Sequence, residues 1–255
     1  MGSTWRTSFV TGVLFLITFV TSIPAALLLY APVLDDVNYV IGAGADTGVA
    51  LGAFLEVLLI IANVGTAVAL FPILKRQNEP LALGSVTARL VECTFIAIGI
   101  GSLLAVVTLR QDFTGAAGGD SSSFVTAGRS LVAVHDWTFL LGPGFIVGVG
   151  NGLILGWLMY RAGLVPRGMA LLGLVAGPVL LAGGTAALLG VIEPDSTLKN
   201  LAAAPEFVWE LSLGIYLMVK GFKSSGIERL QADRRAVPTP HAVPTPCRVV
   251  ADPGG

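Results

Sequence analysis

Several ionisable side chains stand in or beside long apolar stretches, and they are the candidates for chemistry in this sequence. Glu56, Arg89, Glu92 and Glu210 lie within such stretches, and His135 directly precedes one. A charged side chain in hydrocarbon is costly, so these residues usually pair with one another or line a pathway or a site. Carboxylates with a histidine could bind a divalent cation or relay protons.

The helical rise of about 1.5 Å per residue gives each side chain a depth. Glu56 lies about 10 Å and Glu210 about 9 Å from the predicted outer ends of their helices, and His135 lies just above them. We expect these three side chains to line an outward-facing polar pocket for a small solute, an ion or a lipid. They are also the candidates for a metal site. The structural alternative is that each acid is protonated and hydrogen-bonded across helices.

A second polar group lies nearer the predicted inner face. Glu92 is about 9 Å, and Asn63 and Asn151 are about 13–15 Å, from the cytoplasmic ends of their helices. We expect them to extend the polarity of the pocket inward, about 15 Å from the outer group. Arg89 stands at i, i+3 to Glu92, a spacing typical of an intrahelical ion pair. Its long side chain is expected to reach the interface by snorkelling.

The composition is that of a membrane protein. The chain of 255 residues is 54% hydrophobic and 12% charged, with a mean hydropathy of +0.82. The net charge of −1 disfavours nucleic acid as a partner. We predict an all-α bundle of six transmembrane helices with the lipid bilayer as its surroundings. The predicted spans are about 8–30, 49–73, 86–109, 138–159, 168–191 and 204–222, within a domain of residues 1–225.

Basic residues predict the orientation. With the N-terminus inside, eleven Lys and Arg residues lie on the inner side. Only Arg110, Arg129 and Lys199 lie on the outer side. The positive-inside rule then places both termini in the cytoplasm. Residues 110–137 form the longest outer loop, in which we expect a short interfacial helix ending with Trp137 at headgroup level.

Two further segments have clear patterns. Gly144, Gly148, Gly152 and Gly156 recur every four residues in the fourth span, which favours close packing of a neighbouring helix. A groove for a lipid tail is the alternative. Pro143 is expected to kink the outer end of this helix. Residues 236–247 read AVPTPHAVPTPC, and this repeat predicts that 226–255 is a disordered proline-rich tail.

Signatures of known enzyme classes are missing from the sequence. It contains two histidines and no HExxH motif, which disfavours a histidine-rich metalloenzyme. No GxGxxG or GxxxxGK[ST] sequence introduces a nucleotide site, so no cofactor is expected. The two cysteines suggest neither a disulfide framework nor a thiolate metal site.

Three stretches resemble a known family. RLVE opens the third span, HDWTFLLGPGFIVGVGNGLILGWLMYRAGLVPRGMALLGL covers the fourth and fifth, and PEFVWELSLGIYLMVKGF forms the sixth. Together they resemble domain-of-unknown-function family 4386, bacterial integral membrane proteins, from about Thr7 to Lys223. The resemblance implies a location in the bacterial cytoplasmic membrane and a multi-pass architecture. It also marks Arg89, Glu92, His135 and Glu210 as signature positions, with no activity, substrate or cofactor attached.

Three classes of function therefore stay open. The leading hypothesis is a non-enzymatic protein, a transporter or a sensor, that binds or moves a small solute, ion or lipid through the outward-facing pocket. The second is a membrane enzyme with a metal held by Glu56, His135 and Glu210. The third is a purely structural or partner-binding protein whose buried charges fix the helix register.

Overall fold

The computed structural model describes residues 3–42, 44, 46–115, 120–194 and 196–236. These residues form helices and contain no strand. Six of the helices are long and apolar enough to cross a membrane, which confirms the predicted all-α fold with six spans. Each predicted span falls on one of them, although the third and sixth helices begin seven residues earlier than predicted and the fourth helical run begins 17 residues earlier.

The helices follow one another in the chain with short connections. Three segments, η1, η3 and η4, are π-helical, and η2 is a single 3₁₀ turn. The elements are α1 (Ser3–Pro24), η1 (Ala25–Leu29), α2 (Ala31–Asp35), η2 (Tyr39–Ile41), α3 (Asp46–Leu74), α4 (Glu79–Gly115), α5 (Ser121–Leu141), η3 (Gly142–Ile146), η4 (Gly148–Leu155), α6 (Gly156–Ala162), α7 (Arg167–Leu188), α8 (Thr197–Val219) and α9 (Ser224–Ala236).

Local sequence signals set several helix ends. Asp120 caps α5 by accepting a hydrogen bond from the backbone N–H of Ser122, and Ser196 caps α8 in the same way from Lys199. Gly163 ends α6 in the left-handed conformation, with φ of 65°. A side chain is rarely tolerated in that conformation, so the chain can turn sharply there toward α7.

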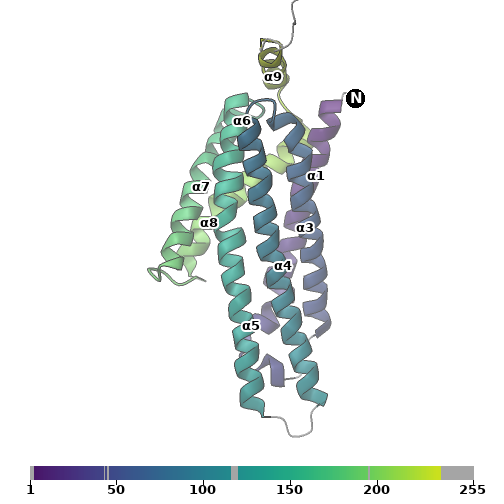
Figure 1. The fold of residues 1–255 in the computed structure, drawn as a ribbon, viewed down its shortest axis with the longest axis vertical. Coiled ribbons are helices and arrows are strands. Elements are labelled where there is room, and N and C mark those ends of the chain that lie inside the picture. The colour runs from purple at the N-terminus through teal and green to yellow at the C-terminus, as the bar shows by residue number, and fades with distance from the viewer. Residues whose placement is uncertain (1–2, 43, 45, 116–119, 195, 237–255) are drawn as a thin grey trace, which may run out of the picture.

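The helices differ greatly in length. α7 has 22 residues, about 33 Å, which matches a hydrocarbon core of about 30 Å. α4 has 37 residues, about 55 Å, and the continuous helical run from Ser121 to Ala162 has 42. Figure 1 shows α4 and α5 continuing well past the ends of α7 and α8. They therefore project beyond the part of the bundle that matches a bilayer.

This projection corrects the expectation of a separate interfacial helix before the fourth span. Residues 121–137 are the first part of α5, in line with the span that follows. They pack against the end of α4, where the rings of Phe113 and Phe124 lie 5.3 Å apart. Phe124, Leu131 and Val132 of the segment pack against a buried cluster that includes α4 side chains, whereas Val134 and Trp137 are exposed.

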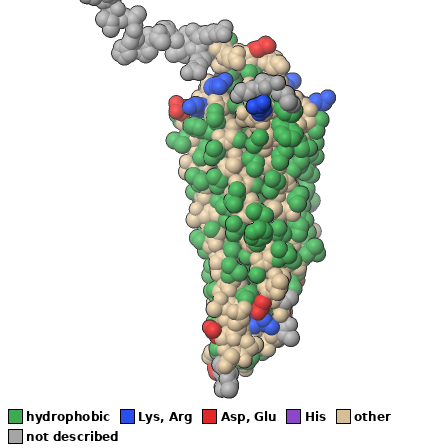
Figure 2. Space-filling model, turned by 90° about the vertical axis from the view of Figure 1, so that its right-hand side faces the viewer, with side chains coloured by type: hydrophobic (Ala, Val, Ile, Leu, Met, Phe, Trp, Pro, Cys, Tyr) green, Lys and Arg blue, Asp and Glu red, His purple; other side chains and the backbone are tan. Residues whose placement is uncertain are grey.

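The surface separates apolar and charged regions. Figure 2 shows hydrophobic side chains over the middle of the molecule and Lys and Arg side chains gathered mainly at the end where the N-terminus lies. We refer to that end as the N-terminal end and to the opposite one as the distal end. A band of apolar side chains between charged ends is the pattern of a chain that spans a membrane.

The glycines of the fourth span lie against α7. A Cβ on Gly152 would fall 2.4 Å from the Cα of Gly177, and one on Gly148 would fall 2.9 Å from the carbonyl oxygen of Gly177. The two backbones approach too closely for any side chain at these positions. Pro143 lies in η3, where the helix widens into π-helical geometry. Prolines and π-helical turns both disturb the regular hydrogen-bond ladder.

Part of the predicted disordered tail is helical, so that prediction was wrong for residues 226–236. α9 is tied to the bundle through the backbone N–H of Lys223, which donates to the carbonyl of Leu164 at 2.8 Å. Leu230 of α9 is buried, which gives this polar helix an apolar anchor. Residues 237–255, with most of the AVPTP repeat, lie outside the described residues.

Candidate functional site

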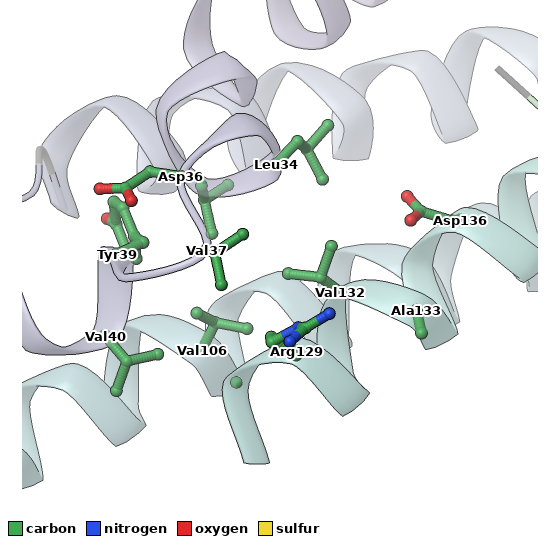
Figure 3. Close-up of a pocket in the computed structure, with 12 residues that line it drawn as sticks. Leu34, Asp36, Val37, Tyr39, Val40, Val106, Arg129, Val132, Ala133 and Asp136 are labelled. Carbon is green, nitrogen blue, oxygen red and sulfur yellow. The ribbon is translucent and has the colours of Figure 1, made fainter. Parts of the chain in front are cut away.

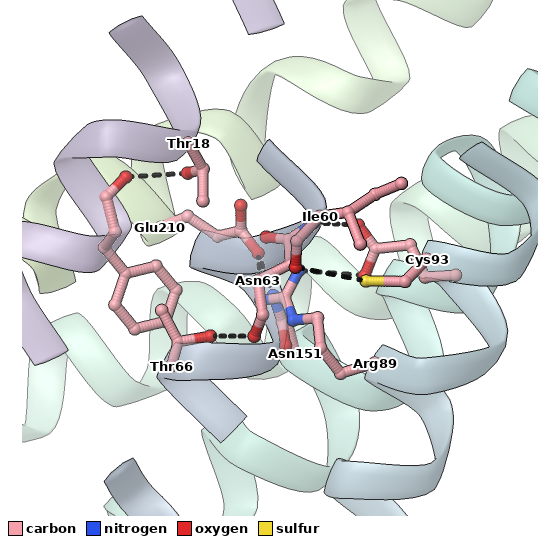
Figure 4. A network of polar contacts seen from close by, with 10 residues as sticks. Thr18, Ile60, Asn63, Thr66, Arg89, Cys93, Asn151 and Glu210 are labelled. Atoms are coloured by element: carbon pink, nitrogen blue, oxygen red, sulfur yellow. Dashed lines mark hydrogen bonds and ion pairs between the residues drawn. The ribbon is translucent and has the colours of Figure 1, made fainter. Parts of the chain in front are cut away.

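A buried cluster of ion pairs joins α4 to α8. Arg89 Nη1 lies 2.8 Å from Glu92 Oε2 on the same helix, and Arg89 Nη2 lies 3.3 Å from Glu210 Oε1 on α8. Arg89 is only 4% exposed. Figure 4 shows its guanidinium among Asn63, Asn151 and Glu210. A guanidinium can serve two carboxylates at once because its donors form a rigid fork.

Two amide side chains complete this cluster. Asn63 of α3 donates a hydrogen bond to Glu92 Oε1 at 3.2 Å, and Asn151 of η4 donates to Glu210 Oε1. The indole N–H of Trp209 donates to the backbone carbonyl of Asn151 at 3.2 Å. Asn63 and Asn151 are both buried. The cluster therefore ties together α3, α4, η4 and α8 deep inside the bundle.

These contacts overturn two expectations. Arg89 does not snorkel, because α4 begins at Glu79 and carries Arg89 about 15 Å into the bundle. Glu210 does not lie level with Glu56 and His135. α8 begins at Thr197, earlier than predicted, so Glu210 is about 20 Å from that end. Glu210 consequently belongs with Glu92, Asn63 and Asn151.

Glu206 lies one turn before Glu210 on α8 and is 4% exposed. Neither of its carboxyl oxygens has a hydrogen-bond partner among the described residues. Its Oε2 lies 2.9 Å from the position that a Cβ on Gly152 would take. The missing side chain of Gly152 therefore leaves the space that the carboxyl group fills.

Glu56 and His135 meet through Tyr30. The Tyr30 hydroxyl donates to Glu56 Oε2 at 2.9 Å, and the ring of His135 stands edge-on to the Tyr30 ring with centroids 5.9 Å apart. His135 also stacks on Phe139, and its Nδ1 lies 3.2 Å from Asp136 Oδ1. His135 Nε2 is buried without a hydrogen-bond partner among the described residues.

The predicted trio is thus divided: Glu56 and His135 are neighbours, and Glu210 lies elsewhere. Within the described part of the chain, no group of three or more His, Cys, Asp or Glu side chains is arranged to hold a metal ion. The metal site proposed for Glu56, His135 and Glu210 therefore has no geometric basis.

A cavity of about 710 Å³ opens beside this second group, where α8 begins. We call it the α8 cavity. It lies between the η1–α2 segment, α5 with η3, and the first turns of α8, and it holds Tyr30, His135 and Lys199 among mainly apolar side chains. It is lined by Ala26, Tyr30, Leu34, Asp35, Ala133, His135, Asp136, Trp137, Phe139, Leu140, Pro143, Gly144, Pro194, Lys199, Asn200 and Ala203.

Lys199 is the cation of this cavity. It is 7% exposed, and its Nζ lies 3.3 Å from the position of a Cβ on Gly144. No carboxylate oxygen of a described residue lies within 4.0 Å of its nitrogen. The acids that line the cavity, Asp35 and Asp136, are both exposed. The α8 cavity thus combines a buried cation with an acidic rim.

A smaller hollow of about 220 Å³ adjoins the α8 cavity and shares Leu34, Ala133 and Asp136 with it. Figure 3 shows these residues with Arg129 and a mainly apolar lining from α2, α4 and α5. The adjoining hollow lengthens the space that an apolar group could occupy.

The connection before α3 has polar contacts of its own. Arg110 Nη1 lies 2.5 Å from Asp46 Oδ1, and the Tyr39 hydroxyl donates to the same oxygen at 3.1 Å. Burial, aided by this hydrogen bond, raises the pKa of Tyr39 to about 12. Of the three basic residues predicted on the outer side, Arg110 is therefore paired within the fold.

Sequence reasoning missed Tyr30, Lys199 and Glu206 as members of these sites. The sequence prediction treats Lys199 only as an outer basic residue, and it starts the sixth span seven residues too late, which hides the depth of Glu206. The useful signal was the spacing of Lys199, Ala203, Glu206 and Glu210, which puts all four on one face of a single helix.

Comparison with known families confirms the resemblance seen in the sequence. Residues 10–221 match the model of the domain of unknown function DUF4386. The chain belongs to the DUF4386 family. The match covers the six spanning helices and ends at Gly221, so α9 lies outside the DUF4386 region. No curated protein and no solved structure matches the chain.

Proposed function

We propose that this DUF4386 protein binds a small amphiphile with an anionic group in the α8 cavity. The observation that carries this proposal is Lys199, a buried ammonium group that faces the cavity without a carboxylate partner among the described residues. Burying an unpaired charge is costly, and a bound anion offsets that cost. The pocket predicted from the sequence, with His135 in its lining, is part of this proposal. Lys199, and not Glu210, is its charged residue.

The lining supports an amphiphile over a small hydrophilic ion. A volume of about 710 Å³ is typical of ligand pockets. Side chains such as Leu34, Phe139 and Leu140 give the cavity an apolar wall. Tyr30 and His135 supply polar edges beside the lysine. A phosphate or carboxylate at Lys199, with an alkyl group along the apolar wall, satisfies both kinds of surface.

We also propose that the N-terminal end faces the cytoplasm of a bacterial cell. Lys75 and Arg76 lie in a connection at that end, Arg161 lies in the last turn of α6 and Arg167 begins α7, and this clustering follows the positive-inside rule. The α8 cavity then opens toward the outer leaflet. Both a lipid headgroup and a free anionic solute can reach it from that side.

Native mass spectrometry of the full chain in detergent tests the binding proposal. The anionic probes are phosphatidylglycerol and decyl phosphate. Zwitterionic phosphatidylcholine is the counterpart of the first, and uncharged decyl maltoside is the counterpart of the second. We expect the wild type to retain at least one anionic probe and Lys199→Met to lose it. Lys223→Met, an exposed lysine at the other end, is the matched control.

The two anionic probes separate the possible sources of the ligand. Retention of phosphatidylglycerol alone indicates a lipid, and retention of decyl phosphate alone indicates a free solute. Equal retention of both anionic probes by wild type and Lys199→Met would overturn the proposal.

A further inference from the structure

Glu206 carries a carboxyl group in surroundings that offer no hydrogen-bond donor from the described residues. The residue is 96% buried, and both of its oxygens lack a partner there. The backbones of Gly152 and Gly177 close the space beside it. An ionised carboxylate in such a place would have lost its water without gaining any compensating contact.

The charges around Glu206 make ionisation still less favourable. Glu210 lies one turn further along α8, and α4 contributes Arg89 and Glu92. Asn63 of α3 and Asn151 of η4 are uncharged, and α7 has no ionisable side chain beyond Arg167 at its start. Three carboxylates would therefore face one guanidinium. A buried cluster with that excess of negative charge binds a cation or a proton.

The contacts indicate which carboxyl group holds the proton. Glu92 accepts hydrogen bonds from Arg89 and Asn63, and Glu210 accepts from Arg89 and Asn151. These donors favour the ionised forms of Glu92 and Glu210. Glu206 has no such donor in the described chain. We propose that Glu206 is a proton-binding site, holding a proton as a neutral carboxylic acid beside the Arg89 cluster.

The carboxyl group lies one helical turn from the α8 cavity. Ala203, which lines the α8 cavity, precedes Glu206 by three positions on the same face of α8. A proton released from the carboxyl group leaves behind the carboxylate, and the same group takes it up again. This site goes beyond the proposed ligand binding and does not depend on what the α8 cavity binds.

Infrared spectroscopy tests the proposal directly, because a protonated carboxyl group has a C=O stretch distinct from that of a carboxylate. We expect the full-length wild type at neutral pH to show a carboxylic-acid band. In Glu206→Gln the intensity of this band should be lower by the contribution of one carboxyl group. Glu193→Gln, at an exposed position, keeps that intensity. Identical carboxylic-acid bands in wild type and a folded Glu206→Gln would overturn the proposal, since Glu206 would then be ionised.

A second measurement needs no variant and decides the matter if Glu206→Gln does not fold. Dicyclohexylcarbodiimide adds to protonated carboxyl groups and rearranges to a stable N-acylurea. We expect tandem mass spectrometry of the treated wild type to locate one adduct on Glu206 and none on the exposed Glu193. Absence of an adduct from Glu206 under conditions that label the free acid of a control peptide contradicts the proposal.

Discussion

Arg89 and Glu210 are separated by 121 positions in the chain, yet their side chains approach to 3.3 Å. This pair connects the third spanning helix to the sixth and brings Glu210 into the inner polar group. The other polar group consists of Glu56, Tyr30 and His135 and lies beside the α8 cavity. The protein thus has two polar centres with different chemistry: one is closed and acidic, and the other opens into a cavity with a buried lysine.

Replacing Arg89 with methionine is expected to destabilise the fold by about 3–5 kcal/mol, because two buried carboxylates lose their counter-ion. Unfolding of the full chain in mixed micelles, followed by circular dichroism, measures the change. Arg229→Met on α9 is the control, since that side chain is exposed. A similar small effect of both substitutions would mean that the Arg89 pairs contribute little.

Alanine at Gly152 is expected to destabilise the protein by about 1–3 kcal/mol, the usual cost of overpacking. Its Cβ would fall 2.4 Å from the Cα of Gly177, so α7 and η4 would have to move apart. Gly101 on α4 offers a matched control, because nothing lies within 4 Å of a Cβ there.

We expect Gly101→Ala to raise stability by about 0.5–1 kcal/mol through the helix propensity of alanine. The same unfolding assay compares the two variants. If both glycines tolerate alanine equally, the close approach of α7 and η4 is wrong.

Much of the fold was predictable because the bilayer constrains it strongly. A run of about 20 apolar residues has few alternatives to a spanning helix, so all six spans could be located. The helix ends were harder, because α4, α5 and α8 continue through residues too polar to count as membrane-spanning. Because the depth of a side chain is counted from the end of its helix, a wrong helix end gives a wrong depth. For this reason the sequence prediction assigns Glu210 to the wrong polar group.

The site was only partly predictable for a related reason. Depth along a helix says nothing about which way a side chain points around it, and the packing of α8 decides whether Lys199 faces lipid or the cavity. Glu56 and His135 both contact Tyr30, which directly follows the π-helical turn η1. Neither feature has a signature in a single sequence.

Stability is expected to fall at high pH because of Tyr39. Its pKa is raised to about 12 in the folded protein, mainly by burial, against about 10 in the unfolded chain. The folded state therefore binds more protons between these values, so this contribution is complete below pH 10 and declines as the pH rises toward 12.

Ultraviolet absorbance of tyrosinate measures the ionisation of Tyr39. The difference titration between wild type and Tyr39→Phe should have its midpoint near pH 12. Tyr39→Phe should also lose part of the decline in stability across that range. A midpoint near pH 10 would show that the phenol is neither buried nor held by Asp46.

Labelling of intact cells tests the proposed orientation. In a background without Cys93 and Cys247, single cysteines replace Asp112 at the distal end or Lys223 before α9. A membrane-impermeant maleimide should label the cysteine at 112 in intact cells and the one at 223 only after lysis. The reverse pattern would invert the topology and turn the α8 cavity toward the cytoplasm.

The affinity of the full chain for decyl phosphate, measured by isothermal titration calorimetry in detergent, tests the central claim most directly. Losing one partner of a buried charge pair costs about 2–5 kcal/mol, so Lys199→Met should weaken binding by at least about 30-fold. Lys223→Met should bind as the wild type does. Equal dissociation constants for wild type and Lys199→Met would contradict an anion site at Lys199. The same conclusion would follow if the wild type neither bound decyl phosphate nor retained phosphatidylglycerol.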